Sequence, residues 1–278
     1  MSRLQNLLKA RLAFRDAHSE IETSNEFAAP PSLGFPHRLF VPEHYEPKYA
    51  YPLVIWLHSD HSSEYELDSV MQALSVRNYV AIAPRAHRVS KHNTRLFRWG
   101  TQIADLAIAE DFVMDAIQEV SESVSIHSDR IFVAGFGTGG SVAQWLGLRH
   151  PHRFAGAISI NGPFPKTKRA LSHWKGARHV PVLFMQGADS ETCSVDATID
   201  TMQLAHAAGL NYRFIRFHAE TGSESDGPDS VPGPASGSLD VEMLRTANRF
   251  LMNLVTGTEV PLAAPEPVSA TLQPYGEN

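Results

Sequence analysis

Residues 131–140, Ile-Phe-Val-Ala-Gly-Phe-Gly-Thr-Gly-Gly, decide the fold of this chain. The run opens with four apolar residues, two of them β-branched, and predicts a buried strand. Four glycines then fall within six positions, and glycine adopts backbone conformations that other residues avoid. The run therefore predicts a strand, a sharp turn centred on Gly137, and a helix that begins directly after the turn.

The same order of signals recurs on both sides of this turn. Further apolar strands are predicted at 53–57, 79–83, 155–160, 180–185 and 212–217, and helices at 65–76, 102–124, 140–149, 195–208 and 240–255. Continuous apolar strands that alternate with helices are typical of a parallel sheet covered on both faces. We therefore expect one α/β domain over residues 33–256, with a mostly parallel central sheet and helices on both faces.

The segments that flank this domain have a different composition. Leucines recur at helical spacing among basic residues near the N-terminus, which predicts an amphipathic helix over residues 1–20. Residues 1–17 could then contact a membrane surface or a partner, or dock on the chain's own domain. Residues 221–239 are rich in Gly, Ser, Pro, Asp and Glu and predict a mobile loop, and the four prolines of 257–278 predict a flexible tail.

Composition excludes several classes of protein. The chain has 278 residues, 43% of them apolar, and a net charge of −6, so it lacks the basic footprint of a nucleic-acid-binding protein. No apolar run approaches the roughly 18 residues that would span a bilayer, and no secretory segment precedes the domain. One cysteine, Cys193, excludes an internal disulfide, so we expect a reducing, cytoplasmic compartment. We expect no cofactor.

From about residue 35 to 255 the chain resembles the α/β-hydrolase superfamily, in its phospholipase, carboxylesterase and thioesterase branch. The resemblance is carried by Pro52–His58, Arg130–Gly140, the run from His150 to Gly162, and Val180–Gly187. In that superfamily the turn after the central strand is the nucleophile elbow, Gly-x-Ser-x-Gly, and the catalytic order is Ser, Asp, His. Gly135 and Gly139 match the flanking glycines of the elbow.

The resemblance implies that all three catalytic stations are changed. The elbow serine is replaced by Gly137, the acid by Ser190, and the histidine by Ser223. A serine in the strained elbow costs about 1–3 kcal/mol, and glycine adopts that conformation without this cost. Loss of the serine or histidine of a triad lowers turnover by about 10⁶.

Neighbouring side chains offer substitutes that the residues alone leave open. Asp189 could act as a displaced acid or lie in a solvated loop, and His218 could be a relocated base or end a strand. Thr138 and Ser141 carry hydroxyls beside the elbow, and Thr138 also supplies a backbone N–H for an oxyanion.

The polar run after the predicted strand 53–57 should line the crevice at the carboxyl ends of the strands. It begins with His58, Ser59, Asp60 and His61, in the place of the family's oxyanion loop. This spacing does not favour a metal site, and we expect none.

The sequence thus favours a catalytically inactive hydrolase homologue, whose crevice is vestigial or binds a small molecule or protein. Two alternatives remain open: an active carboxylic-ester hydrolase with a rearranged site, and an interaction module that acts through the N-terminal helix.

Overall fold

The computed structural model describes residues 36–89, 95–165, 176–187, 194–219, 231–233 and 239–258. Its strands are β1 (His37–Phe40), β2 (Tyr51–Leu57), β3 (Val80–Pro84), β4 (Arg88–Val89), β5 (Phe97–Arg98), β6 (Ile126–Phe136), β7 (Gly156–Ile160), β8 (Val182–Gln186), β9 (Tyr212–Ala219) and β10 (Val231–Gly233). Its helices are α2 (Glu66–Leu74), α3 (Ile103–Ser123), α4 (Thr138–Arg149), α5 (Val195–Ala207) and α6 (Val241–Thr256).

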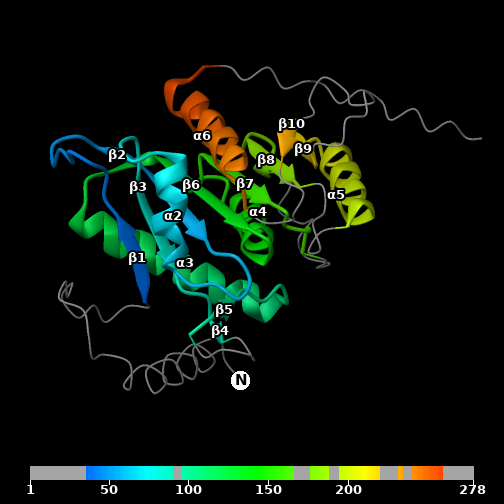
Figure 1. Ribbon diagram of the computed structural model, residues 1–278, viewed down its shortest axis with the longest axis horizontal. Helices are drawn as coiled ribbons and strands as arrows, with labels where there is room; N and C mark the ends of the chain where they lie inside the picture. The colour runs from blue at the N-terminus through cyan, green and yellow to red at the C-terminus, as the bar shows by residue number, and fades with distance from the viewer. Residues whose placement is uncertain are drawn as a thin grey trace, which may run out of the picture.

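Eight strands form one twisted sheet in the order β1-β3-β2-β6-β7-β8-β9-β10 (Figure 1). β1 pairs with β3 antiparallel, and the other neighbours pair in parallel. All seven residues of β2 and all five of β7 are buried, which explains their unbroken apolar sequences. The predicted α/β fold with a mostly parallel sheet is confirmed.

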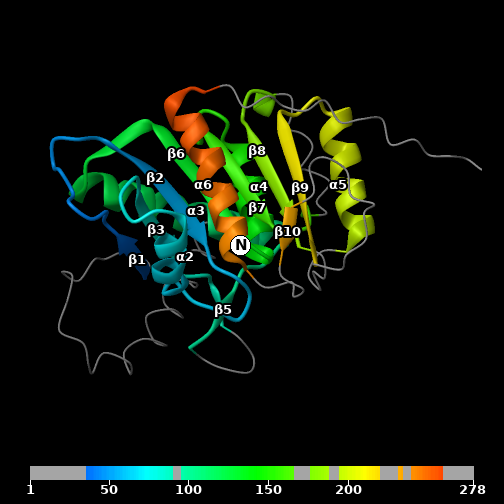
Figure 2. The same cartoon turned by 45° about the horizontal axis from the view of Figure 1, so that its top comes forward.

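Helices cover both faces of this sheet (Figures 1 and 2). The apolar faces of α3 and α4 pack with one side of β2, β3 and β6, and Ala205 of α5 joins the same core. The apolar faces of α2 and α6 cover the opposite side. α6 is capped by the side chain of Asp240, which accepts the N–H groups of Val241 and Glu242, and it ends at Gly257 in a left-handed conformation.

The parallel strands bring two loops together at the centre of the sheet. β2 lies directly beside β6, with Leu57 paired to Gly135, so the loop that begins at His58 meets the turn at Gly137. Ligands of open α/β sheets bind at this edge, outside the carboxyl ends of the strands.

Four strands were not predicted from the sequence. β1 is half exposed at the sheet edge, and β4 and β5 are two-residue strands that form a hairpin projecting from the body of the molecule (Figures 1 and 2). The prediction of a loop over 221–239 is wrong at Val231–Gly233, which form β10 beside β9. The predicted helix 1–20 and all of the predicted tail except Gly257 and Thr258 lie outside the described residues.

Candidate functional site

The turn between β6 and α4 has the backbone geometry of an elbow. Gly137 has φ 58° and ψ −127°, a combination that residues with a side chain rarely adopt. Its N–H donates to the carbonyl of Ile160 at 2.8 Å, and its carbonyl accepts the N–H of Ser141 at 3.1 Å. The chain therefore reverses sharply from strand to helix at this glycine.

The first turn of α4 lies too close to β2 for any side chain at Gly139. A Cβ on Gly139 would lie 2.2 Å from the carbonyl oxygen of Leu57 and 2.6 Å from that of His58. The glycine at this position is required by packing, whatever chemistry the turn performs.

Gly137 itself has room for a side chain. Among the described residues, the heavy atom nearest to a Cβ built there is Oδ2 of Asp60, at 3.7 Å, an ordinary contact distance. Against these residues a serine would fit sterically and would meet only the strain of the positive φ. The described surroundings therefore do not require a glycine at position 137 for reasons of space.

A carboxylate lies over the elbow. Oδ1 of Asp60 accepts a hydrogen bond from the hydroxyl of Thr138 at 2.7 Å, and its other oxygen faces Gly137. In the resembled superfamily this neighbourhood stabilises a developing negative charge. Two negative charges about 4 Å apart repel by about 1 kcal/mol in water and about 4 kcal/mol at an effective dielectric constant of 20. The charge of Asp60 opposes an oxyanion at this position.

The backbone N–H that begins this loop is also engaged. The N–H of Ser59 lies 3.1 and 3.2 Å from the two carboxylate oxygens of Glu66, the first residue of α2, and the Ser59 hydroxyl donates to the same carboxylate. The indole N–H of Trp56 donates to Glu66 as well, at 2.8 Å. The Ser59 N–H is thereby directed to a protein carboxylate and away from the crevice.

His58 is fully buried and both of its ring nitrogens are used. Nδ1 donates to the carbonyl of Ser59 at 2.8 Å, and Nε2 accepts the backbone N–H of Ala86 at 3.1 Å. Burial lowers the pKa of His58, against the opposing effects of the Ser59 bond and of nearby carboxylates. His58 is therefore a neutral residue that joins two segments of chain, and it has no free nitrogen to accept a proton from a nucleophile.

His61, the last residue of the predicted crevice run, is exposed and has a left-handed backbone with φ 55°. Within the described ranges, no group of three or more His, Cys, Asp or Glu side chains is arranged to hold a metal ion.

The two hydroxyls beside the elbow are both engaged. The Thr138 hydroxyl donates to Asp60, as above, and the buried Ser141 hydroxyl donates to the carbonyl of Pro163 at 2.6 Å. Among the described residues, the bond from Thr138 to Asp60 comes nearest to a nucleophile–base pair, with a carboxylate in place of a histidine.

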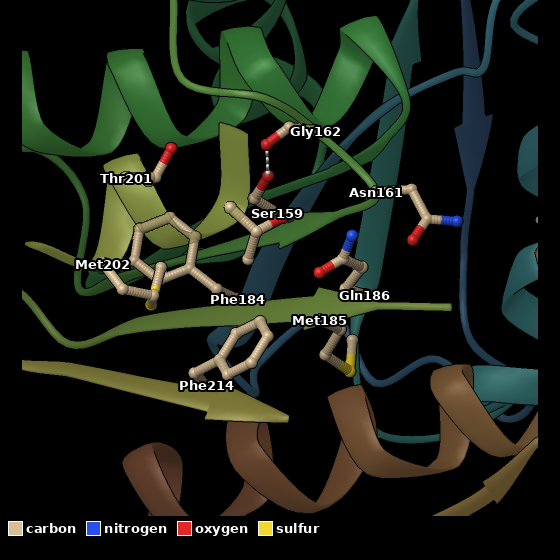
Figure 3. Close-up of a pocket in the computed structure, with 10 residues that line it drawn as sticks. Ser159, Asn161, Gly162, Phe184, Met185, Gln186, Thr201, Met202 and Phe214 are labelled. Atoms are coloured by element: carbon tan, nitrogen blue, oxygen red, sulfur yellow. Dashed lines mark hydrogen bonds between the residues drawn. The ribbon is translucent and has the colours of Figure 1, made fainter. Parts of the chain in front are cut away.

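A small pocket lies between α5 and the strands β7, β8 and β9 (Figure 3). The centre of a water molecule can occupy about 20 Å³ of it, which is the room that one water needs and far less than an acyl chain requires. Apolar side chains and a few polar groups line it: Ser159, Asn161, Gly162, Phe184, Met185, Gln186, Thr198, Thr201, Met202 and Phe214.

The pocket's hydroxyls are directed to backbone carbonyls. Ser159 donates to Gly162 at 3.4 Å, the bond drawn in Figure 3, and Thr201 donates to Ala197 at 2.8 Å.

Residues 101–226 match the family model described as phospholipase/carboxylesterase. Over this part of its length the chain is similar to that family, and its sheet and helices form an α/β-hydrolase fold. No curated protein matches the sequence significantly.

Several solved esterases have the same fold as this chain. Esterase PE8 superposes with a TM-score of 0.61 at 20% identity, over 80% of this chain and 98% of its own. SOBER1 of Arabidopsis thaliana gives 0.59 at 18% identity, over 74% of this chain and all of its own. The carboxylesterase of Bacillus cereus gives 0.57 at 14% identity, over 78% and 93%.

The structure describes only part of the predicted set of site residues. Gly137, Thr138 and the run from His58 to His61 are brought together at one edge of the sheet. His218 lies in β9, where its backbone pairs with Pro232. Asp189, Ser190, Cys193 and Ser223 lie outside the described residues.

Glu66 is the residue of this crevice that sequence reasoning missed. It was visible only as an acidic residue at the start of a predicted helix, a position that carboxylates favour for electrostatic reasons alone. Nothing local indicated that its carboxylate would reach back seven residues to Ser59 and ten to Trp56.

Proposed function

We propose that this chain is a catalytically inactive α/β-hydrolase homologue, a stable domain whose esterase crevice no longer turns over substrate. The observation that carries the proposal is the carboxylate of Asp60, held by Thr138 and facing the bare backbone of Gly137. An esterase needs an attacking oxygen and hydrogen-bond donors for an oxyanion at this place. In this chain Gly137 has no side chain, and the group beside it is the carboxylate of Asp60.

The engagement of Ser59 supports the same conclusion. Its N–H and hydroxyl both donate to Glu66, so loss of function extends from the nucleophile to the loop beside it. The replacement of the acid and base stations by Ser190 and Ser223 is part of the proposal and rests on the sequence alone.

Hydrolysis of p-nitrophenyl butyrate by the purified full chain tests this proposal. We expect the rate with protein to equal the rate in buffer, and the Thr138→Val and His218→Ala variants to match it. Turnover that scales with protein concentration and is lost in either variant would contradict the proposal. It would instead support the rearranged-site hydrolase, with Thr138 or His218 in its chemistry.

A triple reversion tests the assignment of the three stations. Gly137→Ser, Ser190→Asp and Ser223→His together restore the side chains of the triad, and we expect the chain to keep its fold. Recovered esterase activity would confirm the register of the stations. A further Asp60→Asn change should then raise the recovered rate, because it removes the negative charge beside the oxyanion.

A further inference from the structure

The hairpin segment, which consists of the described residues 85–89 and 95–98 with the paired strands β4 and β5, contacts loop 58–63 at a few specific points. The backbone N–H of Ala86 donates to Nε2 of His58 at 3.1 Å, and the N–H of Phe97 donates to the carbonyl of Ser62 at 2.7 Å. Arg85 forms an ion pair with the buried carboxylate of Glu64, just beyond the loop. The loop so held is the one that places Asp60 over Gly137.

The contact from Ala86 exists only while His58 is neutral. Nδ1 of His58 donates its proton to Ser59, so Nε2 has a free lone pair and accepts from Ala86. A proton on Nε2 would place an imidazolium N–H directly against the amide N–H, and neither group could accept from the other. Protonation therefore exchanges a buried hydrogen bond for a repulsive contact.

A second buried histidine lies on the same segment. The ring of Trp99 lies near both imidazoles, with its centroid 5.5 Å from that of His58 and 6.5 Å from that of His87. Nε2 of His87 is 3.0 Å from the carboxylate of Asp105, while its Nδ1 is buried without a hydrogen-bond partner among the described residues. A proton added to Nδ1 would be buried without an acceptor, which costs about 1–3 kcal/mol or more for a charged group.

The charged groups that face these two histidines come from several elements. Asp60 of the loop and Glu64 and Glu66 at the start of α2 favour a charged His58. Asp105 of α3 favours a charged His87, and Arg88 of β4 opposes it. In both cases burial is the largest effect, and the pKa of each histidine lies below its ordinary value.

We propose that His58 and His87 form an acid-sensitive latch, whose protonation releases the hairpin segment (residues 85–89 and 95–98) from loop 58–63 and frees Asp60 from its position over the elbow. The latch is closed while both rings are neutral. The released segment binds protons more tightly than the closed one, so closure is most stable above about pH 6.5, the ordinary pKa of histidine. Its stability is lost as the pH falls below that value. The proposal is independent of whether the elbow is catalytic.

Residue-resolved hydrogen exchange of the full chain tests the latch. Exchange is measured at pH 7.5 and pH 5.0, with the intrinsic pH dependence of amide exchange divided out. We expect the protection of the Ala86 and Phe97 amides to fall roughly tenfold or more at the lower pH, since closure is linked to deprotonation. The amide of Val133 in β6 should keep its protection.

Two variants make the test specific. In His58→Gln an uncharged amide oxygen can accept from Ala86 at either pH, so most of the pH dependence at Ala86 should disappear. His206→Gln removes an exposed histidine on α5 and should behave as the native chain does.

Three results would overturn the proposal: equal protection at the two pH values, equal loss at Val133, or an unchanged pH dependence in His58→Gln. Should that variant fail to fold, the native chain decides. Loss of protection at Ala86 with retention at Val133 supports the latch, and joint loss or no loss contradicts it.

Discussion

The elbow and the loop that faces it are held by different kinds of contact. The elbow, Gly135–Gly140, has the sharp backbone reversal of a nucleophile elbow, and its neighbours fit so closely that Gly139 admits no Cβ. Loop 58–63 is filled with side-chain interactions, namely a carboxylate over Gly137, an N–H committed to Glu66 and a buried neutral histidine. Packing therefore accounts for the elbow backbone without any catalytic role, whereas the loop side chains place a carboxylate over the elbow and engage the N–H of Ser59.

The largest effect should come from adding a methyl group where the elbow meets β2. Gly139→Ala places a Cβ 2.2 Å from the carbonyl of Leu57, and backbone on both sides prevents relief. We expect a loss of about 3 kcal/mol or more in the free energy of unfolding, or a chain that does not fold. Urea denaturation measures the loss. Gly176→Ala, with no atom within 4 Å of its Cβ, is the matched control and should change stability by less than about 0.5 kcal/mol.

The next largest loss of stability is expected at Asp105, whose buried carboxylate contacts His87 and Arg88 at the base of the β4–β5 hairpin. Burial raises the pKa of Asp105, but hydrogen bonds from Arg88 and His87 outweigh it and the pKa lies below its ordinary value. The folded state therefore gains stability above the ordinary pKa of about 3.9 and loses it as the pH falls further. Asp105→Asn should cost about 2–3 kcal/mol at pH 7, with a smaller difference from the native chain below pH 4.

Urea denaturation at both pH values measures the effect of Asp105→Asn, with the exposed Asp200→Asn as control. A pH-independent cost would show that the charge of Asp105 contributes nothing.

A smaller loss of stability is expected at Gly137, where a substitution meets backbone strain but little conflict of packing. Gly137→Ala adds a Cβ that meets only Asp60, at an ordinary distance, so its cost is that of the positive φ, about 1–3 kcal/mol. The comparison with Gly139→Ala is the informative quantity. Equal losses in the two variants would show that the space at Gly137 is filled and that a serine does not fit there.

The smallest loss of stability is expected from breaking the hydrogen bond between Thr138 of the elbow and Asp60 of loop 58–63. Thr138→Val keeps the shape of the side chain and removes its hydrogen bond to Asp60. We expect a loss of about 1 kcal/mol, measured by thermal unfolding, because Asp60 is partly exposed and water replaces part of the bond. Thr138→Ser keeps the hydroxyl and should restore most of the loss. A Thr138→Val variant as stable as the native chain would indicate that Asp60 is not held by this bond.

Much of the fold was predictable because its signals are local. The apolar run at Leu53–Leu57 and the glycines of 135–140 indicated buried strands and a tight turn without any knowledge of their neighbours. β10 and the β4–β5 hairpin were missed because their two or three residues are held by pairing with other segments and have no apolar pattern of their own.

The sequence predicted which residues lie at the site but not the contacts that they make. His58, Ser59, Asp60 and Thr138 were expected at one edge of the sheet, and they lie there. The hydrogen bonds of these residues join distant positions: Thr138 bonds to Asp60 across 78 positions, and Ala86 bonds to His58 across 28. No periodicity or spacing encodes which oxygen accepts from which donor over such separations.

We propose a crevice without an activated nucleophile, and intact-mass measurement after treatment with a fluorophosphonate tests this most directly. The native chain should keep its mass, because Gly137 offers no attacking oxygen and the hydroxyls of Thr138 and Ser141 are already hydrogen-bonded. A stoichiometric adduct on the native chain would contradict the account, and the adduct's position would identify the residue that reacts.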